Sequence, residues 1–306
     1  HYSLGGSLQE LGKLDEAMIS YSAAIKLKPD NSDAHFNLGF ILSELGNHKK
    51  AEVHFRLSNL KKSQSFILRC LYLQNEQSLF YEQLDYLLNQ GEINAMIGSL
   101  SCRAATKYGI ERENIFCKDP ITYVLRTDLK DKYDFDDTLI KTAKNIINNN
   151  KDQFKSQGLL INGRQTAGNL FSIKNSFTDT IQRIIHLEIN NYRNYFKNSK
   201  EGFITNWPND YNLYGWLISI KSGGELHPHI HERGWISGSI YINVPAKLKA
   251  NSGNLVVCID DEKSHKKTIN VVTGNLCLFP SSLFHYTIPF QSDEERIVLA
   301  FDVVPE

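Results

Sequence analysis

The sequence predicts an α+β protein in which α-helical repeats precede a jelly-roll domain with a buttressing helix. Two observations carry this prediction. A five-residue pattern recurs at a fixed interval near the N-terminus, and beyond about residue 210 the chain changes to short apolar runs separated by turn residues. Sequence patterns that recur about every 34 residues form helical hairpins. Many short apolar runs with turns between them are typical of an antiparallel sandwich or barrel.

A five-residue pattern near the N-terminus occurs twice. His1-Tyr-Ser-Leu-Gly5 recurs as His35-Phe-Asn-Leu-Gly39, an offset of 35 − 1 = 34 residues. In this pattern and period the segment resembles tetratricopeptide repeats. The residues that continue the pattern are Ala17, Tyr21, Ala24, Pro29, Ala51 and Phe55. We therefore assign residues 1–62 to tetratricopeptide repeats, the first of which lacks its opening residues. Stacked repeats bind partners on a concave surface, so a protein or peptide docking there is one expectation, and a helical cap on the next domain is the other.

Residues 63–160 are expected to form a helical continuation or linker domain. Apolar residues follow one another at three- and four-residue intervals between residues 64 and 110, which indicates helices. Gly91 and Gly109 are expected to end two of them, because glycine commonly terminates a helix. A further helix is expected from Asp136 to Ile147.

Residues 161–306 are expected to form the jelly roll. A helix from Lys174 to Phe196 has one apolar face, which should buttress a sheet. The short apolar runs predict strands near 212–220, 226–231, 236–243, 254–260, 267–272, 275–279, 283–288 and 295–303. Such a fold encloses a pocket between two sheets, where the inward residues of facing strands converge.

Histidines mark a candidate metal site in this domain. Three of the ten histidines, His227, His229 and His231, fall within five residues. Residues two apart in a strand point to the same face, so His229 and His231 can aim at one point. Neutral imidazole suits iron, zinc and copper. His285, on a later predicted strand, is the candidate for a third ligand, and His227 is expected to flank the site.

Three motifs occur in a fixed order around these histidines. They read His229-Ile-His231, Ser237-Gly-Ser-Ile-Tyr241 and Phe279-Pro-Ser-Ser-Leu-Phe-His285, and Arg296 follows. In this order they resemble the Fe(II)/2-oxoglutarate-dependent dioxygenases, in particular those that carry His-x-His. The resemblance covers about the last 140 residues and implies Fe(II) and 2-oxoglutarate as cofactors. It also implies hydroxylation of a C–H bond, a reaction that needs no general base, so no catalytic residue beyond the metal ligands is assigned.

The second ligand position departs from the usual pattern of that superfamily. Its iron site is usually His-x-Asp/Glu plus a distal His, whereas this chain has His231 in the acidic position. Three arrangements are open: a three-histidine site, a carboxylate supplied by Glu232, or two protein ligands only. Adjacent strand residues face opposite ways, so Glu232 would need a bulge to turn inward. We therefore favour His231.

The resemblance assigns Arg296 to the far carboxylate of 2-oxoglutarate, because a guanidinium pairs with a carboxylate through two parallel hydrogen bonds. The apolar run after Arg296 predicts that it lies on a core strand; the alternative is a surface salt bridge with Glu294 or Glu295. Ser219, Ser237 and Tyr241 are further candidates for hydrogen bonds to the cosubstrate, and each is alternatively an ordinary core residue.

Charge and cysteine content bound the remaining classes. Lys plus Arg and Asp plus Glu both number 34, so no basic excess points to nucleic acid or to an anionic membrane. Five scattered cysteines form no CxxC pair, which favours a reducing, cytoplasmic setting. No apolar run is long enough to span a bilayer.

The sequence thus predicts an Fe(II)/2-oxoglutarate-dependent dioxygenase that hydroxylates an unidentified substrate, and the attached repeats make a protein or peptide plausible by analogy. One alternative is a three-histidine metal dioxygenase of the cupin type that uses no 2-oxoglutarate. Another is a non-catalytic interaction protein based on the repeats. Arg296 argues against the first alternative, and the complete histidine set argues against the second.

Overall fold

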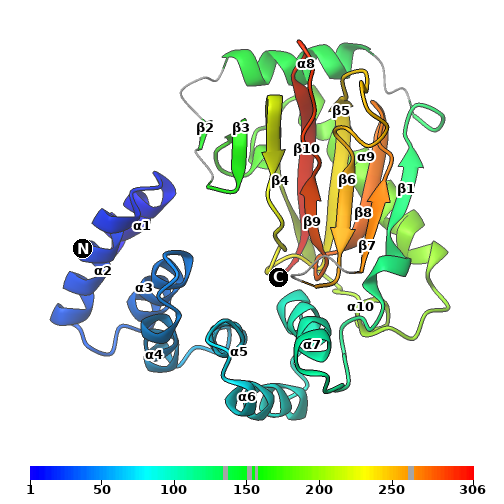
Figure 1. Cartoon of the computed structure of the whole chain (residues 1–306). Coiled ribbons are helices and arrows are strands. Elements are labelled where there is room, and N and C mark those ends of the chain that lie inside the picture. Colours follow the sequence, from blue (N-terminus) through cyan, green and yellow to red (C-terminus); the bar gives the residue numbers. More distant parts are fainter. Residues whose placement is uncertain (134–136, 150–153, 156–157, 261–264) are drawn as a thin grey trace. The chain divides into compact units, whose positions relative to one another are not determined.

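The fold was obtained as a computed structural model, which describes the whole chain except residues 134–136, 150–153, 156–157 and 261–264. The described chain divides into two compact units (Figure 1). The first comprises residues 1–93 and 104–112, and the second comprises residues 94–103 and 113–306. Each unit has its own architecture.

The first unit is built from helical hairpins. Its helices are α1 (Tyr2–Glu10), α2 (Leu14–Leu27), α3 (Ser32–Glu44), α4 (His48–Ser58), α5 (Ser63–Leu73) and α6 (Gln77–Asn89), and α7 (Ala95–Tyr108) is shared between the units. Consecutive helices pack against each other (Figure 1). Gly91 and Gly109 follow α6 and α7 with φ of +67°, so both glycines end a helix as predicted, in the left-handed conformation that glycine adopts most readily.

The two N-terminal hairpins repeat one close contact. A Cβ atom at Gly5 would lie 2.8 Å from the ring of Tyr21, and one at Gly39 would lie 3.0 Å from the ring of Phe55. In each hairpin the glycine therefore lets an aromatic ring from the second helix reach the backbone of the first. This packing contact explains why small and aromatic residues recur at a fixed spacing in the sequence. The predicted helical repeats are confirmed.

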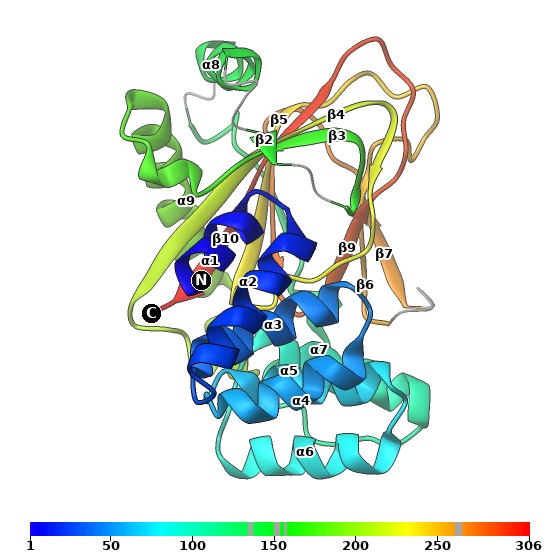
Figure 2. The same ribbon diagram turned by 90° about the vertical axis from the view of Figure 1, so that its left-hand side faces the viewer.

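The second unit contains two antiparallel sheets. The strand order of the larger sheet is β1 (Leu125–Asp128), β8 (Asn275–Pro280), β5 (Ile236–Asn243), β10 (Arg296–Pro305), β4 (Tyr211–Leu226), β3 (Leu160–Thr166) and β2 (Phe154–Lys155). The smaller sheet consists of β7 (Lys266–Ile269), β6 (Leu255–Cys258) and β9 (Phe284–Thr287). Figure 2 shows the smaller sheet on one side of the larger one, and the predicted α+β fold with a jelly roll is confirmed.

Helices α8 (Asp137–Asn149) and α9 (Ser176–Tyr195) lie on the other side of the large sheet (Figure 2). The unit also contains the short α10 (Gly202–Thr205) and 3-10 turns at η1 (Pro120–Tyr123) and η3 (Leu170–Ser172). The predicted buttressing helix is α9, which starts with a capping box between Asn175 and Thr178. Its buried face includes Phe177, Ile181, Ile184, Ile185, Ile189 and Tyr192. No helix among the described residues is both long and apolar enough to cross a membrane.

Three sequence expectations need comment. The predicted strand at 226–231 is wrong, because β4 ends at Leu226 and Pro228, which has no N–H, interrupts the ladder. Strand β1 was not predicted, because Leu125-Arg-Thr-Asp128 is too short and polar to show a period. The predicted helix start at Asp136 lies outside the described residues, and α8 begins at Asp137.

Candidate metal centre

Three imidazole rings converge in the second unit. One ligand atom from each of His229, His231 and His285 lies within 4.8 Å of the others. His285 belongs to β9, whereas the other two lie on the irregular segment after β4. An isolated β-bridge joins the segments, with His229 and His285 exchanging N–H···O bonds of 3.2 and 3.0 Å. This bridge, rather than the expected strand alternation, brings the histidines together.

Two of the rings have their Nδ1 atoms on fixed acceptors. His229 Nδ1 lies 2.8 Å from the main-chain oxygen of His227, and His231 Nδ1 lies 2.6 Å from Oδ1 of Asp302. Carbonyl and carboxylate oxygens can only accept, so each Nδ1 carries the hydrogen. The Nε2 atom of each ring therefore presents a lone pair.

These lone pairs form a site that fits a cation. The Nε2 atoms of His229 and His231 are 3.2 Å apart, and in these tautomers neither has a hydrogen to place between them. Two lone pairs at this separation repel unless a cation lies beside both. Metal–nitrogen distances are about 2.0–2.1 Å, so two such donors lie about 2.8–3.0 Å apart in an octahedral site and about 3.3–3.4 Å apart in a tetrahedral site. The three imidazoles therefore fit a divalent transition metal.

Burial keeps two of these imidazoles, those of His229 and His285, in the form that binds metal. Desolvation, followed by the charge of His231, lowers the pKa of His229 to about 3. Desolvation and the charges of the other two histidines hold the pKa of His285 well below its usual value. A metal binds neutral imidazole, so His229 and His285 are ready to bind at neutral pH without losing a proton.

The neighbouring candidates have other positions. Glu232 lies in the turn after His231 and is not part of the converging group among the residues that the structure describes. The ring of His227 lies 3.4 Å from Glu225 Oε1, on the surface. His227 therefore contributes its carbonyl group, as the acceptor for His229, and its ring faces away.

Arg296 is the first residue of β10 and is buried, with 3% of its surface exposed. Its Nε donates to the main-chain oxygen of Gly253 at 3.1 Å, and its guanidinium carbon lies 5.1 Å from the ring centroid of Tyr241. Burial lowers the pKa of Arg296, which the Tyr241 side chain partly offsets. Within the described chain no carboxylate lies at ion-pair distance from Arg296, and Glu295 instead lies 3.5 Å from Arg164. A buried cation without a carboxylate partner suits an anionic ligand.

The two serines predicted to act with Arg296 lie elsewhere. Ser219 donates to Glu295 Oε2 at 2.5 Å. Ser219 faces Ile297 in the ladder while Arg296 faces Ile220, so the side chains of Ser219 and Arg296 lie on opposite faces of the sheet. Ser237 contacts His231. Of the three candidates, the structure brings only Tyr241 to Arg296.

Sequence reasoning missed two charged residues of this region. Asp302 contacts His231, and its signal was a single carboxylate within the apolar strand from Ile297 to Val304. Lys247 lies close enough to Arg296 for that charge to lower the Lys247 pKa, after the larger effect of desolvation. No periodic pattern surrounds Lys247, so the sequence offered no signal for it.

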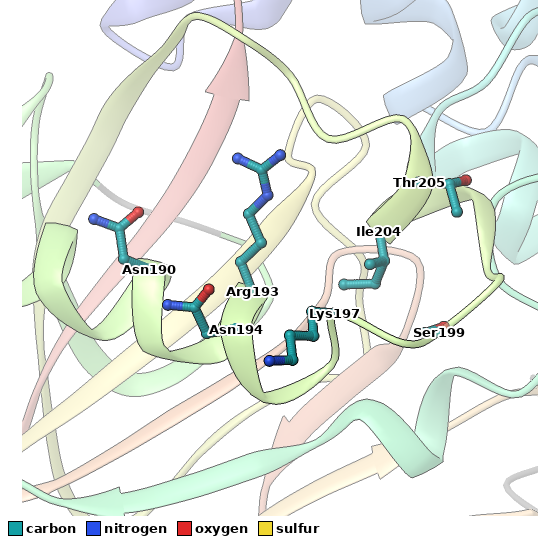
Figure 3. Close-up of a pocket in the computed structure, with 7 residues that line it drawn as sticks. All are labelled: Asn190, Arg193, Asn194, Lys197, Ser199, Ile204 and Thr205. Carbon is teal, nitrogen blue, oxygen red and sulfur yellow. The ribbon is translucent and has the colours of Figure 1, made fainter.

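A polar pocket of about 600 Å³ lies elsewhere in the second unit (Figure 3). It is lined by Asn190, Arg193, Asn194, Lys197, Ser199, Ile204 and Thr205. These residues come from the end of α9, from α10 and from the loop between them. None of the predicted site residues lines this pocket.

Comparison with known families agrees with the two-part organisation. Residues 214–302 match the family described as "Putative 2OG-Fe(II) oxygenase", where 2OG is 2-oxoglutarate. Residues 5–46 match the TPR (tetratricopeptide) repeat. No curated protein sequence matches the chain.

The solved structures that match the chain include two prolyl hydroxylases. The Pseudomonas putida prolyl-4-hydroxylase is 12% identical, with 60% of this chain and 92% of that chain covered and a TM-score of 0.43. The Trichoplax adhaerens enzyme, in complex with a hypoxia inducible factor peptide fragment, is 10% identical, with 72% and 92% covered and a TM-score of 0.43. HygX from Streptomyces hygroscopicus, with nickel and 2-oxoglutarate bound, is 10% identical, with 60% and 82% covered and a TM-score of 0.39. The family matches define the organisation: the chain carries a 2OG-Fe(II) oxygenase domain in residues 214–302, preceded by tetratricopeptide repeats.

Proposed function

We propose that the protein is an Fe(II)/2-oxoglutarate-dependent dioxygenase in which His229, His231 and His285 bind the iron. One observation carries the proposal: the Nε2 atoms of His229 and His231, each with a free lone pair, lie 3.2 Å apart. They lie within a segment that matches this oxygenase family. Three neutral imidazoles leave coordination positions open for other ligands. When bound, Fe(II) and 2-oxoglutarate together would reduce dioxygen to an oxidant that hydroxylates a C–H bond.

The chain's own residues would orient the ligands and exclude water. Aromatic rings border two of the histidines: the Trp216 centroid lies 5.4 Å from that of His231, and the Phe279 centroid 4.9 Å from that of His285. These rings limit the access of water to the metal position, which strengthens the electrostatic interactions there. No proton transfer by a side chain is required.

Arg296 would bind the far carboxylate of 2-oxoglutarate. A carboxylate loses its hydration on entering a protein interior, and a fixed guanidinium compensates through two charge-assisted hydrogen bonds. The absence of a carboxylate beside Arg296 among the described residues supports this role. Tyr241 packs against the guanidinium and would restrict its orientation.

The three-histidine dioxygenase without 2-oxoglutarate is the second candidate. It is favoured by one observation: the converging group contains no carboxylate among the described residues. Arg296 opposes it, because a site without a dicarboxylate gives this buried cation no ligand. The substrate of either enzyme is proposed to be a protein or peptide, and the tetratricopeptide repeats at residues 5–46 are proposed as its docking surface.

The test is turnover of the cosubstrate. The full chain is purified without oxygen, loaded with Fe(II), and mixed with 2-oxoglutarate and air-saturated buffer. We expect succinate to form slowly even without substrate, and to form only with Fe(II) present. A chain that binds Fe(II) but neither binds 2-oxoglutarate nor forms succinate would favour the second candidate.

A further inference from the structure

A buried carboxylate supports one of the three converging histidines. Asp302 lies on β10, beside Ser237 on the neighbouring strand β5. Its Oδ1 is 2.6 Å from His231 Nδ1 and 2.7 Å from the hydroxyl oxygen of Ser237. The hydroxyl oxygen of Ser281 lies 2.8 Å from that of Ser237. All four side chains therefore belong to one network, which we call the Asp302 network.

The positions of the hydrogens in the Asp302 network follow from the carboxylate of Asp302. An ionised carboxylate donates no hydrogen, so His231 Nδ1–H and Ser237 O–H both donate to Asp302. The oxygen of Ser237 can then accept the O–H of Ser281. Every hydrogen has one place in this arrangement, and it fixes His231 in the tautomer whose lone pair is on Nε2. Neither Lys nor Arg pairs with Asp302 among the described residues, so the imidazole is its principal partner.

The backbone makes room for the network at Gly234. A Cβ atom there would lie 2.5 Å from Ser281 Oγ and 3.1 Å from Asp302 Oδ1, closer than ordinary contact. Asp302 and Ser281 are 8% and 0% exposed. The carboxylate is therefore enclosed and cannot exchange its partners for water without local rearrangement.

We propose that Asp302 is a positioning residue for the metal centre: it holds the His231 ring in one tautomer and one orientation, with Nε2 toward the metal. The proposal rests on the proposed function, because it gives His231 a ligand role. Carboxylate groups behind ligating histidines raise ligand basicity and fix the ring, and their loss typically lowers metal affinity by ~10- to 100-fold.

Two variants separate the contributions of charge and hydrogen bonding. Asp302→Leu keeps the approximate volume and removes the acceptor, so Fe(II) affinity should fall by ~10- to 100-fold. Asp302→Asn retains an oxygen that can accept Nδ1–H, so it should lose less affinity than Asp302→Leu. Glu188→Gln is the control, because Glu188 is a buried carboxylate on α9 that pairs with Lys132 and Tyr133. It should leave Fe(II) affinity unchanged.

Two measurements test the proposal on the full chain. Anaerobic calorimetric titration with Fe(II) alone gives the affinity. Nitrogen-15 NMR of the metal-free protein gives the tautomer of His231, whose signal is assigned by its loss in His231→Asn. We expect hydrogen on Nδ1 in the wild type and in Asp302→Asn, and a mixture of tautomers in Asp302→Leu. A merely structural role would not change the tautomer.

The possible results separate this proposal from the proposed function. A wild-type chain that binds no Fe(II) would overturn both. Fe(II) binding that is equally tight in the wild type, Asp302→Leu and Asp302→Asn would overturn only the role of Asp302, as would hydrogen on Nε2 of His231 in the wild type. If Asp302→Leu does not fold, Asp302→Ala takes its place: it also removes the acceptor, so a mixture of tautomers is expected, and hydrogen that stays on Nδ1 alone would overturn the role of Asp302.

Discussion

Strand β10 buries two charged side chains on the same face, Arg296 at its first residue and Asp302 toward its other end, and they differ in what meets them. Asp302 lies 2.6 Å from the imidazole of His231. Arg296 is also buried but has no carboxylate partner in the described chain. A buried charge that has its counterpart within the fold positions its neighbours. A buried charge without a counterpart is poised for a ligand, since an uncompensated charge is costly in a protein interior.

The largest expected effect is at the metal end. In His231→Asn the amide N–H can replace Nδ1–H as the donor to Asp302, but nothing replaces Nε2. The carboxylate therefore stays hydrogen-bonded while the metal loses a ligand. Fe(II) affinity should fall by more than about 100-fold. That is more than the loss expected for a residue, such as Asp302, that only hydrogen-bonds to a metal ligand. Glu232→Gln should retain the iron, because Glu232 is not part of the converging group.

Iron content after anaerobic loading, measured by elemental analysis, distinguishes the two variants. Iron loss in Glu232→Gln would assign the second ligand position to Glu232. Full occupancy in both variants would leave two protein ligands only, and either result would contradict the assignment of His231.

The next effect is a pH dependence of stability in the metal-free chain. The pKa of folded His229 is about 3, and an unfolded histidine has a pKa of about 6.5. Between these values the unfolded state binds a proton that the folded state does not. The contribution of His229 to the free energy of unfolding is therefore fully present above pH ~6.5 and decreases as the pH falls. His229 keeps part of its surface exposed, so its contribution should be at most about 1.4 kcal/mol per pH unit.

Urea unfolding at pH 7.5 and pH 5.5 measures this effect. All three tryptophans, Trp207, Trp216 and Trp235, lie in the second unit, so their fluorescence reports on the unit that holds the histidines. His229→Asn should lose less stability than the wild type over this interval. An identical loss in both proteins would show that His229 is already accessible to protons when folded.

A smaller effect is expected beside Arg296. Lys247 is close enough to Arg296 for their charges to interact, and both would attract the same dicarboxylate. Lys247 is partly exposed, so solvent and salt screen part of its contribution. Lys247→Met should weaken 2-oxoglutarate binding by about 2- to 5-fold at low salt, and less at high salt. Titrations at two salt concentrations check this, and an effect that does not change with salt would argue against an electrostatic role.

The sequence predicted those features that depend on period and spacing. The helical repeats followed from small and aromatic residues at a fixed offset, which proved to be contacts such as Gly39 with Phe55. The strands around Arg296 and Tyr241 followed from their apolar runs. Such patterns are set locally, so they are readable without a structure.

Features that depend on partners across the sheet were beyond prediction. Ser219 and Ser237 lie on opposite faces of the large sheet. Ser219 donates to Glu295, and Ser237 donates to Asp302. Their partners depend on strand register, and a shift of one residue exchanges the two faces. The same limit explains the wrong strand at 226–231, where an isolated bridge to His285 replaces a continuous ladder.

The most direct test of the central claim is the affinity of the Fe(II)-loaded chain for 2-oxoglutarate with and without the Arg296 cation. Arg296→Met approximates the shape of the side chain and touches no proposed iron ligand, so iron binding should be retained. Loss of one member of a buried charged pair costs about 3–5 kcal/mol, which corresponds to a loss of affinity of about 100-fold or more. Arg296→Lys should be intermediate, because it keeps the charge and loses the fork.

Anaerobic titration, followed by the metal-to-ligand absorption band, provides the dissociation constants. We expect tight binding in the wild type and at least about 100-fold weaker binding in Arg296→Met. An unchanged dissociation constant in Arg296→Met would contradict it, remove Arg296 from the cosubstrate site and favour the three-histidine dioxygenase that uses no 2-oxoglutarate.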